Sequence, residues 1–169
     1  LSYEVDNADR LIKETQSTAA GTNVVAYEYD VLDRRTQRTV NGTEATVYAY
    51  DKAGRLTGIT YAGQTTSYAY DAAGRLTRKT LPNGIQQTLA YDNASRLLSI
   101  AYSQPDATVI DTISYTYDAN GRRTSKTSSS NSTAQETGFT ATYDAADRMT
   151  AVVLKGTGVG GVDESCTLN

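Results

Sequence analysis

The phrase Tyr-Asp-x-x-x-Arg recurs along the whole chain at a nearly constant spacing. A degenerate first copy has Val5-Asp6 with Arg10, and six full copies follow it. Consecutive copies lie 20 to 26 residues apart, and a fixed period of this length is typical of repeat architectures whose units pack mainly on their neighbours. The full copies are Tyr29, Asp30 and Arg34; Tyr50, Asp51 and Arg55; Tyr70, Asp71 and Arg75; Tyr91, Asp92 and Arg96; Tyr117, Asp118 and Arg122; and Tyr143, Asp144 and Arg148.

Local chemistry predicts that each phrase is the tip of a β-hairpin. Residues 66–70 alternate as a strand does, with Tyr68 and Tyr70 on one face. Asp71 suits the start of a turn of about four residues, since its side chain can accept backbone N–H groups further on. Gly74 then stands where the turn needs a positive φ, and Arg75 begins the return strand. The other copies have Gly54, Gly121, Asp9, Asp33, Asp147 or Ser95 at this position.

A second set of turns lies between the phrases. Asn41-Gly42 is a strong hairpin signal, and Ala62-Gly63 and Asn83-Gly84 are weaker ones. Longer loops at residues 104–106 and 128–132 explain the wider spacings. Residues 7–16 could form a short helix, but their match to the repeat favours a strand.

The predicted fold is therefore all-β: an antiparallel meander of roughly twelve strands of 5–8 residues over residues 1–154. Such a long sheet must twist, coil or close. We expect a coiled β-strip, either a spiral shell section or a solenoid-like fibre. Residues 155–169 are expected to be a glycine-rich tail or the start of a following segment.

Composition limits the function classes. Leu, Ile, Val and Phe account for only 29 of 169 residues, but thirteen tyrosines and a net charge of −3 favour ordered β structure over disorder. Without a Lys/Arg run we expect no nucleic-acid partner, and without a long apolar stretch no membrane span. The start at Leu1 and the lack of a signal peptide indicate an excerpt or a processed product.

The segments YDKAGRLTGIT and YDAAGRLTRKT resemble the YD repeats of the rearrangement-hotspot (RHS) superfamily, and the resemblance covers residues 3 to about 154. That superfamily includes bacterial polymorphic toxins, shell components of insecticidal toxin complexes, wall-associated proteins and animal teneurins. The resemblance implies a β-strip wound into a hollow shell, which encloses a toxin domain in the toxins and supports adhesion in teneurins. It also implies a secreted or cell-surface location, bacterial in preference to animal.

One departure from the family limits what is carried over. Family shells are usually closed by a proline-containing plug segment at which the chain cleaves itself, and this chain has only Pro82 and Pro105. Autoproteolysis is therefore not expected here. Seven repeats are also too few to wind a complete shell.

The Asp, Arg and Tyr residues of the motif could have a chemical or a structural role. The aspartates could hold calcium, which prefers oxygen ligands, but we favour a structural reading in which Asp caps its turn and Arg packs on Tyr or pairs with a neighbouring Asp. The tyrosine stripe could bind glycan or peptide, although a packed face explains it better. The chain has no histidine, so catalysis by an imidazole and metal binding through an imidazole are both excluded.

Three isolated signals are weaker. Cys166 is expected to be a bystander, with an intermolecular disulfide as the alternative. Gly156–Gly161 matches a dinucleotide fingerprint but lacks the helix and acidic residue that this site requires. Glycosylation sequons at Asn41, Asn93 and Asn131 are explained by chance in a Ser/Thr-rich chain. We therefore predict no catalytic residue, cofactor or metal.

The leading hypothesis is a non-enzymatic section of an RHS-like shell that encloses or displays a cargo carried elsewhere in the parent chain. The partners would be further repeats of the same chain, or copies of it, and an enclosed toxin domain. A self-assembling extracellular filament is the first alternative, since exposed ends could pair head to tail. The second is an adhesion module that binds glycan or protein through the tyrosine face or the loops near Pro105 and Ser129.

Overall fold

The computed structural model describes residues 1–130, 136–156 and 164–167. These residues form fifteen β-strands and no helix. The strands are β1 Ser2–Val5, β2 Leu11–Thr18, β3 Gly21–Tyr29, β4 Arg35–Val40, β5 Glu44–Tyr50, β6 Leu56–Tyr61, β7 Gln64–Tyr70, β8 Leu76–Thr80, β9 Gln86–Tyr91, β10 Leu97–Ser103, β11 Val109–Tyr117, β12 Arg123–Ser130, β13 Glu136–Tyr143, β14 Met149–Lys155 and β15 Glu164–Thr167.

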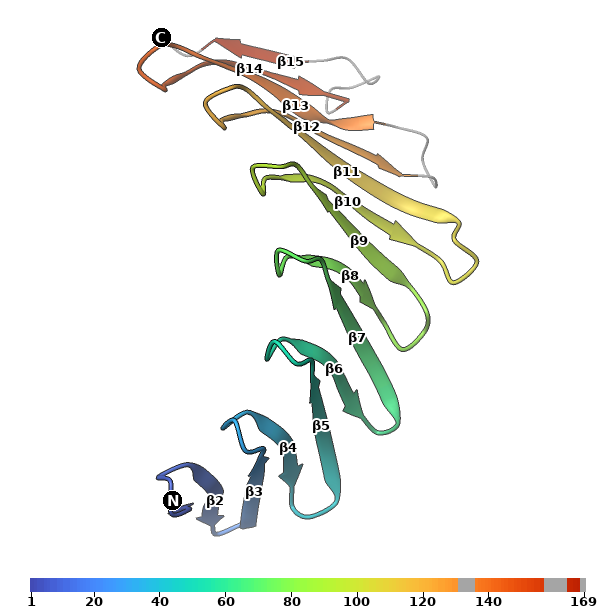
Figure 1. The fold of residues 1–169 in the computed structure, drawn as a ribbon. Helices are drawn as coiled ribbons and strands as arrows, with labels where there is room; N and C mark the ends of the chain where they lie inside the picture. The colour runs from blue at the N-terminus through green and yellow to red at the C-terminus, as the bar shows by residue number, and fades with distance from the viewer. Residues whose placement is uncertain (131–135, 157–163, 168–169) are drawn as a thin grey trace. The chain divides into compact units, whose positions relative to one another are not determined.

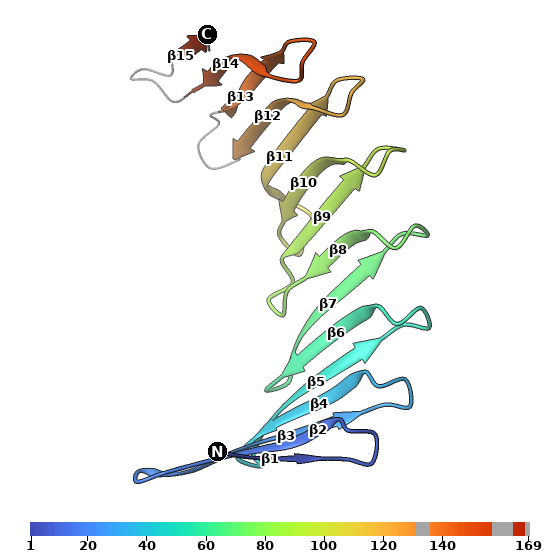
Figure 2. The same cartoon turned by 90° about the vertical axis from the view of Figure 1, so that its left-hand side faces the viewer.

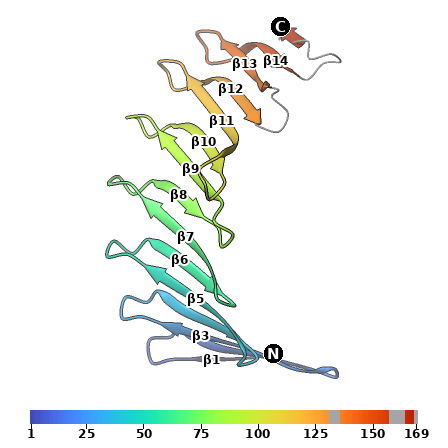
Figure 3. The ribbon, with the colours of Figure 1, turned by 90° about the vertical axis from the view of Figure 1, so that its right-hand side faces the viewer.

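The chain divides into two units, one of residues 1–75 with 80–82 and one of residues 76–79 with 83–169. Within each unit, strands that follow one another in the chain lie side by side and pair antiparallel, for example β2–β3–β4–β5 in the first and β11–β12–β13–β14 in the second (Figure 1). In each unit the turns that hold the motif aspartates project from the same side, as Figures 2 and 3 show from opposite directions. Each unit is thus a meander of hairpins, as the repeat predicts.

The strand register is constant from copy to copy. The residue seven after a motif Asp lies opposite the residue three before the next motif Tyr, as in Gln37↔Val47, Gly58↔Ser67 and Ser99↔Ser114. The register shifts by a β-bulge or similar irregularity beside the motif tyrosines of β3, β5, β9, β11 and β13, so that Tyr50 pairs with Leu56. This irregularity interrupts the regular ladder just before the turn.

The strand count exceeds the expectation. Fourteen strands lie within residues 2–155 where roughly twelve were predicted, and their lengths reach nine residues. The sequence pattern predicts a loop at residues 128–132, yet residues 128–130 belong to β12, with sequence RTSKTSSS, because backbone pairing does not require an apolar pattern. The connection at residues 104–108 has five residues against two at Ala62-Gly63, so a longer loop contributes to the wider spacing as predicted, and β11, with nine residues, contributes as well. Leu11–Thr18 is a strand, so the helical alternative for residues 7–16 is wrong.

Strands also continue beyond residue 154. Glu164–Thr167 form β15, which pairs with β14 through Ala151↔Thr167 and Val152↔Cys166. Residues 157–161 of the glycine-rich stretch and the sequon at Asn131 lie outside the described residues. The described part contains no helix long and apolar enough to cross a membrane.

Neither unit has a closed hydrophobic core. Among the described residues Ala141, 5% exposed, is the one buried apolar side chain, and most tyrosines and leucines of the sheet are half-buried. A single-layer sheet keeps both faces accessible, whereas most domains bury a face against a second layer. Strand pairing and side-chain contacts along the strip must therefore supply much of the stability.

Candidate functional site: the clasp between repeats

Each motif Asp organises its own turn, here called the Asp turn and defined by the five residues from the motif Asp to the motif Arg. In the copy at Asp51, the Asp51 N–H donates to the Arg55 carbonyl (2.9 Å) and the Gly54 N–H to the Asp51 carbonyl (3.0 Å). Oδ1 of Asp51 accepts the backbone N–H groups of Ala53 and Arg55, both at 2.9 Å. Oδ2 accepts Nε of Arg55 at 2.7 Å. One carboxylate thus caps the turn and fixes the arginine that leaves it.

The fourth residue of every Asp turn has a positive φ, as the turn chemistry predicts. Gly54 and Gly74 have φ of 81° and 82°, and Ser95, the weakest fit in the sequence, has 62°. Non-glycine residues rarely adopt this conformation, and Asp and Asn do so most readily. The remaining copies are Asp9 (58°), Asp33 (60°), Gly121 (84°) and Asp147 (63°).

The motif arginine also reaches forward to the next copy. The Arg55 guanidinium lies over the Tyr70 ring, 4.9 Å from its centroid, and Nη1 donates to the Asp71 carbonyl at 3.0 Å. The Tyr70 hydroxyl returns a hydrogen bond of 2.8 Å to the Leu56 carbonyl. We call this set, the arginine and following carbonyl of one copy with the Tyr-Asp pair of the next, the clasp. It joins consecutive repeats by a cation–π contact and two hydrogen bonds.

The clasp recurs with little variation. The guanidinium-to-ring distances are 4.8–5.0 Å, and Nη1 lies 2.9–3.3 Å from the Asp carbonyl of the next copy. Complete clasps are seen, for example, in Arg10 with Tyr29-Asp30, Arg34 with Tyr50-Asp51, Arg55 with Tyr70-Asp71, Arg96 with Tyr117-Asp118, and Arg122 with Tyr143-Asp144.

Two clasps carry an additional ion pair between the motif Arg and an Asp of the next copy. Asp33 Oδ1 lies 2.6 Å from Nη1 of Arg10, and Asp147 Oδ1 lies 2.7 Å from Nη1 of Arg122. Both aspartates occupy the positive-φ position, where Gly54 instead leaves room near Arg34 Nη1. Pairing of Arg with a neighbouring Asp agrees with the sequence prediction, but Asp in place of Gly at this position predicted only the backbone conformation and not which Asp would pair.

Within each Asp turn, the N–H groups and the guanidinium around the carboxylate favour the ionised form of the motif Asp. The backbone N–H of Arg55, followed by its guanidinium, lowers the pKa of Asp51 below its ordinary value against the opposing effect of burial. In Asp30 the guanidinium of Arg34 is the larger cause of the lowered pKa. All seven motif aspartates shift in the same direction. Donation by N–H groups to the charged form explains the direction.

The side chain of Arg148 is more exposed than that of the preceding motif arginine. Arg148 holds its own Asp144 at 2.7 Å, yet its side chain is 80% exposed, whereas the side chain of Arg122 is 22% exposed. No described tyrosine lies under Arg148. At the other end, the first copy has Val5, which is exposed, in the place of the tyrosine.

This geometry is that of a cross-link. Both oxygens of each motif carboxylate accept N–H groups, which are donors that compete with a cation for the same lone pairs. No group of three or more His, Cys, Asp or Glu side chains that could hold a metal ion is found within the described ranges. The contacts run from one repeat to the next, so the motif links copies instead of converging on a substrate.

Comparisons with known proteins agree with this geometry. The RHS Repeat family model matches residues 50–85 and 70–109. A crystal structure of TcdB2–TccC3–Cdc42 matches with a TM-score of 0.73 and 19% identity, covering 90% of this chain and 9% of that one. A Photorhabdus luminescens Tc holotoxin pore matches with a TM-score of 0.66 and 25% identity, covering 80% of this chain and 7% of that one. No curated protein sequence gives a significant match.

The fold and the clasp thus define the molecule as a β-hairpin repeat protein. More particularly, residues 50–109 match the RHS Repeat family, and the chain has the fold found in Tc toxin structures. It spans less than a tenth of the length of the chains that it matches.

Proposed function

We propose that this chain is a non-enzymatic section of an RHS-type shell, secreted or exposed at a cell surface, whose parent polypeptide encloses or displays a cargo domain. The structural role follows from the shared repeat fold. The enclosed cargo is proposed because TccC3 and TcdB2 occur together in the structures that this chain resembles. Both faces of the single-layer sheet are accessible, as a shell wall requires.

The observation that carries the proposal is the recurrence of the clasp. Each clasp holds the arginine of one copy against the Tyr-Asp pair of the next, so consecutive hairpins are joined into one continuous strip. Repeats that contact mainly their neighbours extend in one direction, and a continuous strip of this kind can form the wall of a shell.

The native polypeptide provides the test. Its mass, measured by mass spectrometry, should exceed the 18.2 kDa of these residues many times over, and its sequence should contain further Tyr-Asp repeats. Electron microscopy of the native material should show discrete hollow particles. A native mass near 18.2 kDa, or uniform filaments, would contradict the proposal.

A further inference from the structure

One Asp turn carries two large apolar side chains, Val31 and Leu32, here called the tip. They are 98% and 65% exposed. The turn itself does not need them, since the Leu32 N–H donates to Oδ1 of Asp30 at 2.9 Å through the backbone alone. The Ala53 N–H makes the same hydrogen bond in the next copy with only a methyl side chain. Elsewhere these two positions hold Asn7-Ala8, Lys52-Ala53, Ala72-Ala73, Asn93-Ala94, Ala119-Asn120 and Ala145-Ala146.

The tip stands on a fixed and electrically balanced base. Asp30 pairs with Arg34 of its own turn at 2.6 Å, and Asp33 pairs with Arg10 of the preceding copy at 2.6 Å. Each carboxylate beside the tip is therefore balanced by a guanidinium. A group that is fixed in this way loses little conformational freedom when it binds, and adjacent exposed apolar side chains that the fold does not require are typical of an interaction surface.

A mainly apolar hollow of about 350 Å³ lies in the same unit, around the Ala62-Gly63 turn. It is formed by that turn with the first residues of β5 and the last residues of β6, and includes Val47 and Tyr61, which are 43% and 45% exposed. Its polar groups already have partners. The Tyr61 hydroxyl donates to Glu44 at 2.7 Å, and the Thr60 hydroxyl shares a hydrogen bond of 2.8 Å with a threonine of β7. An apolar guest can therefore enter without leaving these groups unpaired.

The tip and the hollow cannot meet within one copy. The tip lies at the Asp-turn end of the hairpins, and the Ala62-Gly63 turn lies at the opposite end. A strand rises about 3.3 Å per residue, so the seven residues of β5 alone separate the two ends by roughly 23 Å. A contact between the tip and the hollow therefore needs a second molecule.

We propose that the tip of one copy binds in the hollow of a second copy of this chain. The two chains then lie edge to edge, and the contact is heterologous because two different surfaces meet. Valine and leucine match the apolar lining, and the hollow exceeds the space that two aliphatic side chains fill. Little more than one turn is buried, well below the ~1,200 Å² of a stable interface, so we expect a transient contact and no filament. The contact does not depend on the proposed shell role.

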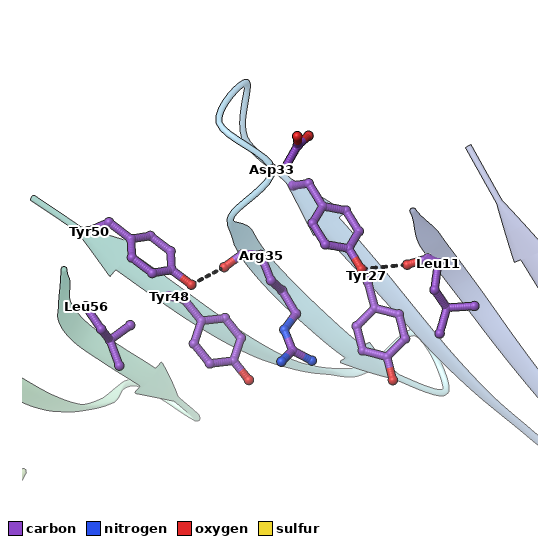
Figure 4. A pocket seen from close by; sticks show the side chains of 8 residues that line it. Leu11, Tyr27, Asp33, Arg35, Tyr48, Tyr50 and Leu56 are labelled. Carbon is purple, nitrogen blue, oxygen red and sulfur yellow. Dashed lines mark hydrogen bonds between the residues drawn. The ribbon is translucent and has the colours of Figure 1, made fainter. Parts of the chain in front are cut away.

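The larger hollow on the tyrosine face, of about 530 Å³, suits the tip less well. There the Arg35 guanidinium lies 5.4 Å from the ring centroid of Tyr27 and 5.3 Å from that of Tyr48 (Figure 4). An apolar side chain placed over it would take a guanidinium out of water without supplying an acceptor. A lipid surface is also less suitable, because the carboxylates of Asp30 and Asp33 stand on either side of the tip.

Disulfide capture tests the contact, since a disulfide forms only where two Cβ atoms approach to about 4.5 Å. Val31→Cys and Thr43→Cys chains, both with Cys166→Ser to remove the single native thiol, are mixed and oxidised with copper phenanthroline. Heavy nitrogen in one chain lets mass spectrometry distinguish mixed dimers, of about twice 18.2 kDa, from dimers of one variant. Lys52→Cys, at the same place in the next Asp turn, is the matched control for Val31→Cys. We expect mixed dimers roughly tenfold faster with Val31→Cys, because Leu32 remains beside it as an apolar anchor.

Leu32→Ala in the Val31→Cys chain should slow the capture roughly tenfold, since alanine buries much less apolar surface. Alanine occurs at this position in other Asp turns, so the variant should keep the parental circular dichroism spectrum. Equal capture by Val31→Cys and Lys52→Cys, or capture unchanged by Leu32→Ala, would overturn the proposal. Dimers formed mainly between two Val31→Cys chains would overturn it too, as would Leu32-dependent sedimentation of the parent chain with phosphatidylcholine vesicles.

Discussion

The turns at the two ends of the hairpins differ in how uniform their length and hydrogen bonding are. At one end every Asp turn has the same length, hydrogen bonds and positive φ. At the opposite end the fully described connections range from the two residues Ala62-Gly63 to the five residues 104–108. Both ends belong to the same sheet and close the same kind of hairpin, so strand reversal alone does not explain the uniformity of the Asp turns.

The turn at Gln104–Thr108 shows what the difference means. The Gln104 N–H donates to the Thr108 carbonyl at 2.8 Å, the Ala107 N–H donates to the Gln104 carbonyl at 3.0 Å, and Ala107 has a φ of 68°. This is the backbone pattern of an Asp turn, made without the motif Tyr or Arg. The turn therefore does not need those residues, and their recurrence reflects the clasp to the next repeat.

Acid should distinguish the two ends most strongly. The pKa of each motif Asp is lowered in the folded chain, so its stabilising effect is present above the unfolded value near 4 and is lost as the pH falls through the lower folded value. All seven motif aspartates act together, and we expect the thermal midpoint, followed by circular dichroism, to drop steeply below about pH 4.

Two single variants separate the ends. Asp51→Asn should make the acid transition shallower, because it removes a carboxylate that the Arg55 guanidinium stabilises. Asp106→Asn should change it less, since Asp106 receives the backbone N–H of Thr108 and has no arginine partner. A thermal midpoint that is unchanged between pH 7 and pH 3 would contradict the stabilising role of the motif aspartates in the Asp turns.

At the opposite end, local packing should set the cost of a substitution. Gly84→Ala places a Cβ 2.7 Å from Cγ of Pro105 at a φ of 82°. We expect a loss of about 3 kcal/mol in unfolding free energy, combining left-handed strain with overpacking. Gly63→Ala, with φ 75° and open space around the Cβ, should lose only about 1 kcal/mol. Equal losses in urea denaturation would show that the Pro105 contact does not matter.

At the Asp-turn end, the cost should depend on whether the clasp is complete. Arg55→Leu removes the contact with Tyr70 and the hydrogen bond to the Asp71 carbonyl, and should lose about 2 kcal/mol. Arg148→Leu removes a single exposed ion pair and should lose less than about 1 kcal/mol. Similar values for the two variants would indicate that the arginine acts within its own turn only.

A smaller effect is expected from the tyrosine hydroxyl. Tyr70→Phe deletes the hydrogen bond to the Leu56 carbonyl and should lose about 1 kcal/mol. Tyr68, two residues earlier on the same strand, has no hydroxyl partner among the described residues, and Tyr68→Phe should be close to neutral. A larger loss in Tyr68→Phe would reverse the assignment of the clasp tyrosine.

The sequence predicted the periodic parts of this structure. The alternation before Asp71 and the Gly at position 74 were enough to predict the hairpin and its positive φ, because both depend on short-range sterics and hydrogen bonding. The strands richest in Ser and Thr, such as β12, were undercounted, since pairing in a repeat is set by the neighbouring strands as well as by the local pattern.

The partners within the clasp could be predicted only in part. Packing of Arg on Tyr or pairing with a neighbouring Asp was foreseen, but Arg55 does both, with Asp51 of its own copy and Tyr70 of the next. A single copy cannot show which contacts cross the repeat boundary, because they depend on the register between strands. The β-bulge beside Tyr50 is part of that register, and no residue of the motif predicts it.

The most direct test of the central claim is a double-mutant cycle on Arg55 and Tyr70. If these residues join consecutive repeats, Arg55→Leu and Tyr70→Leu should show a coupling energy of about 0.5–1 kcal/mol in urea unfolding. Arg55→Leu with Tyr29→Leu, whose ring lies under Arg10, should be additive within about 0.3–0.5 kcal/mol. Additivity in the first pair, or equal coupling in both, would contradict the clasp.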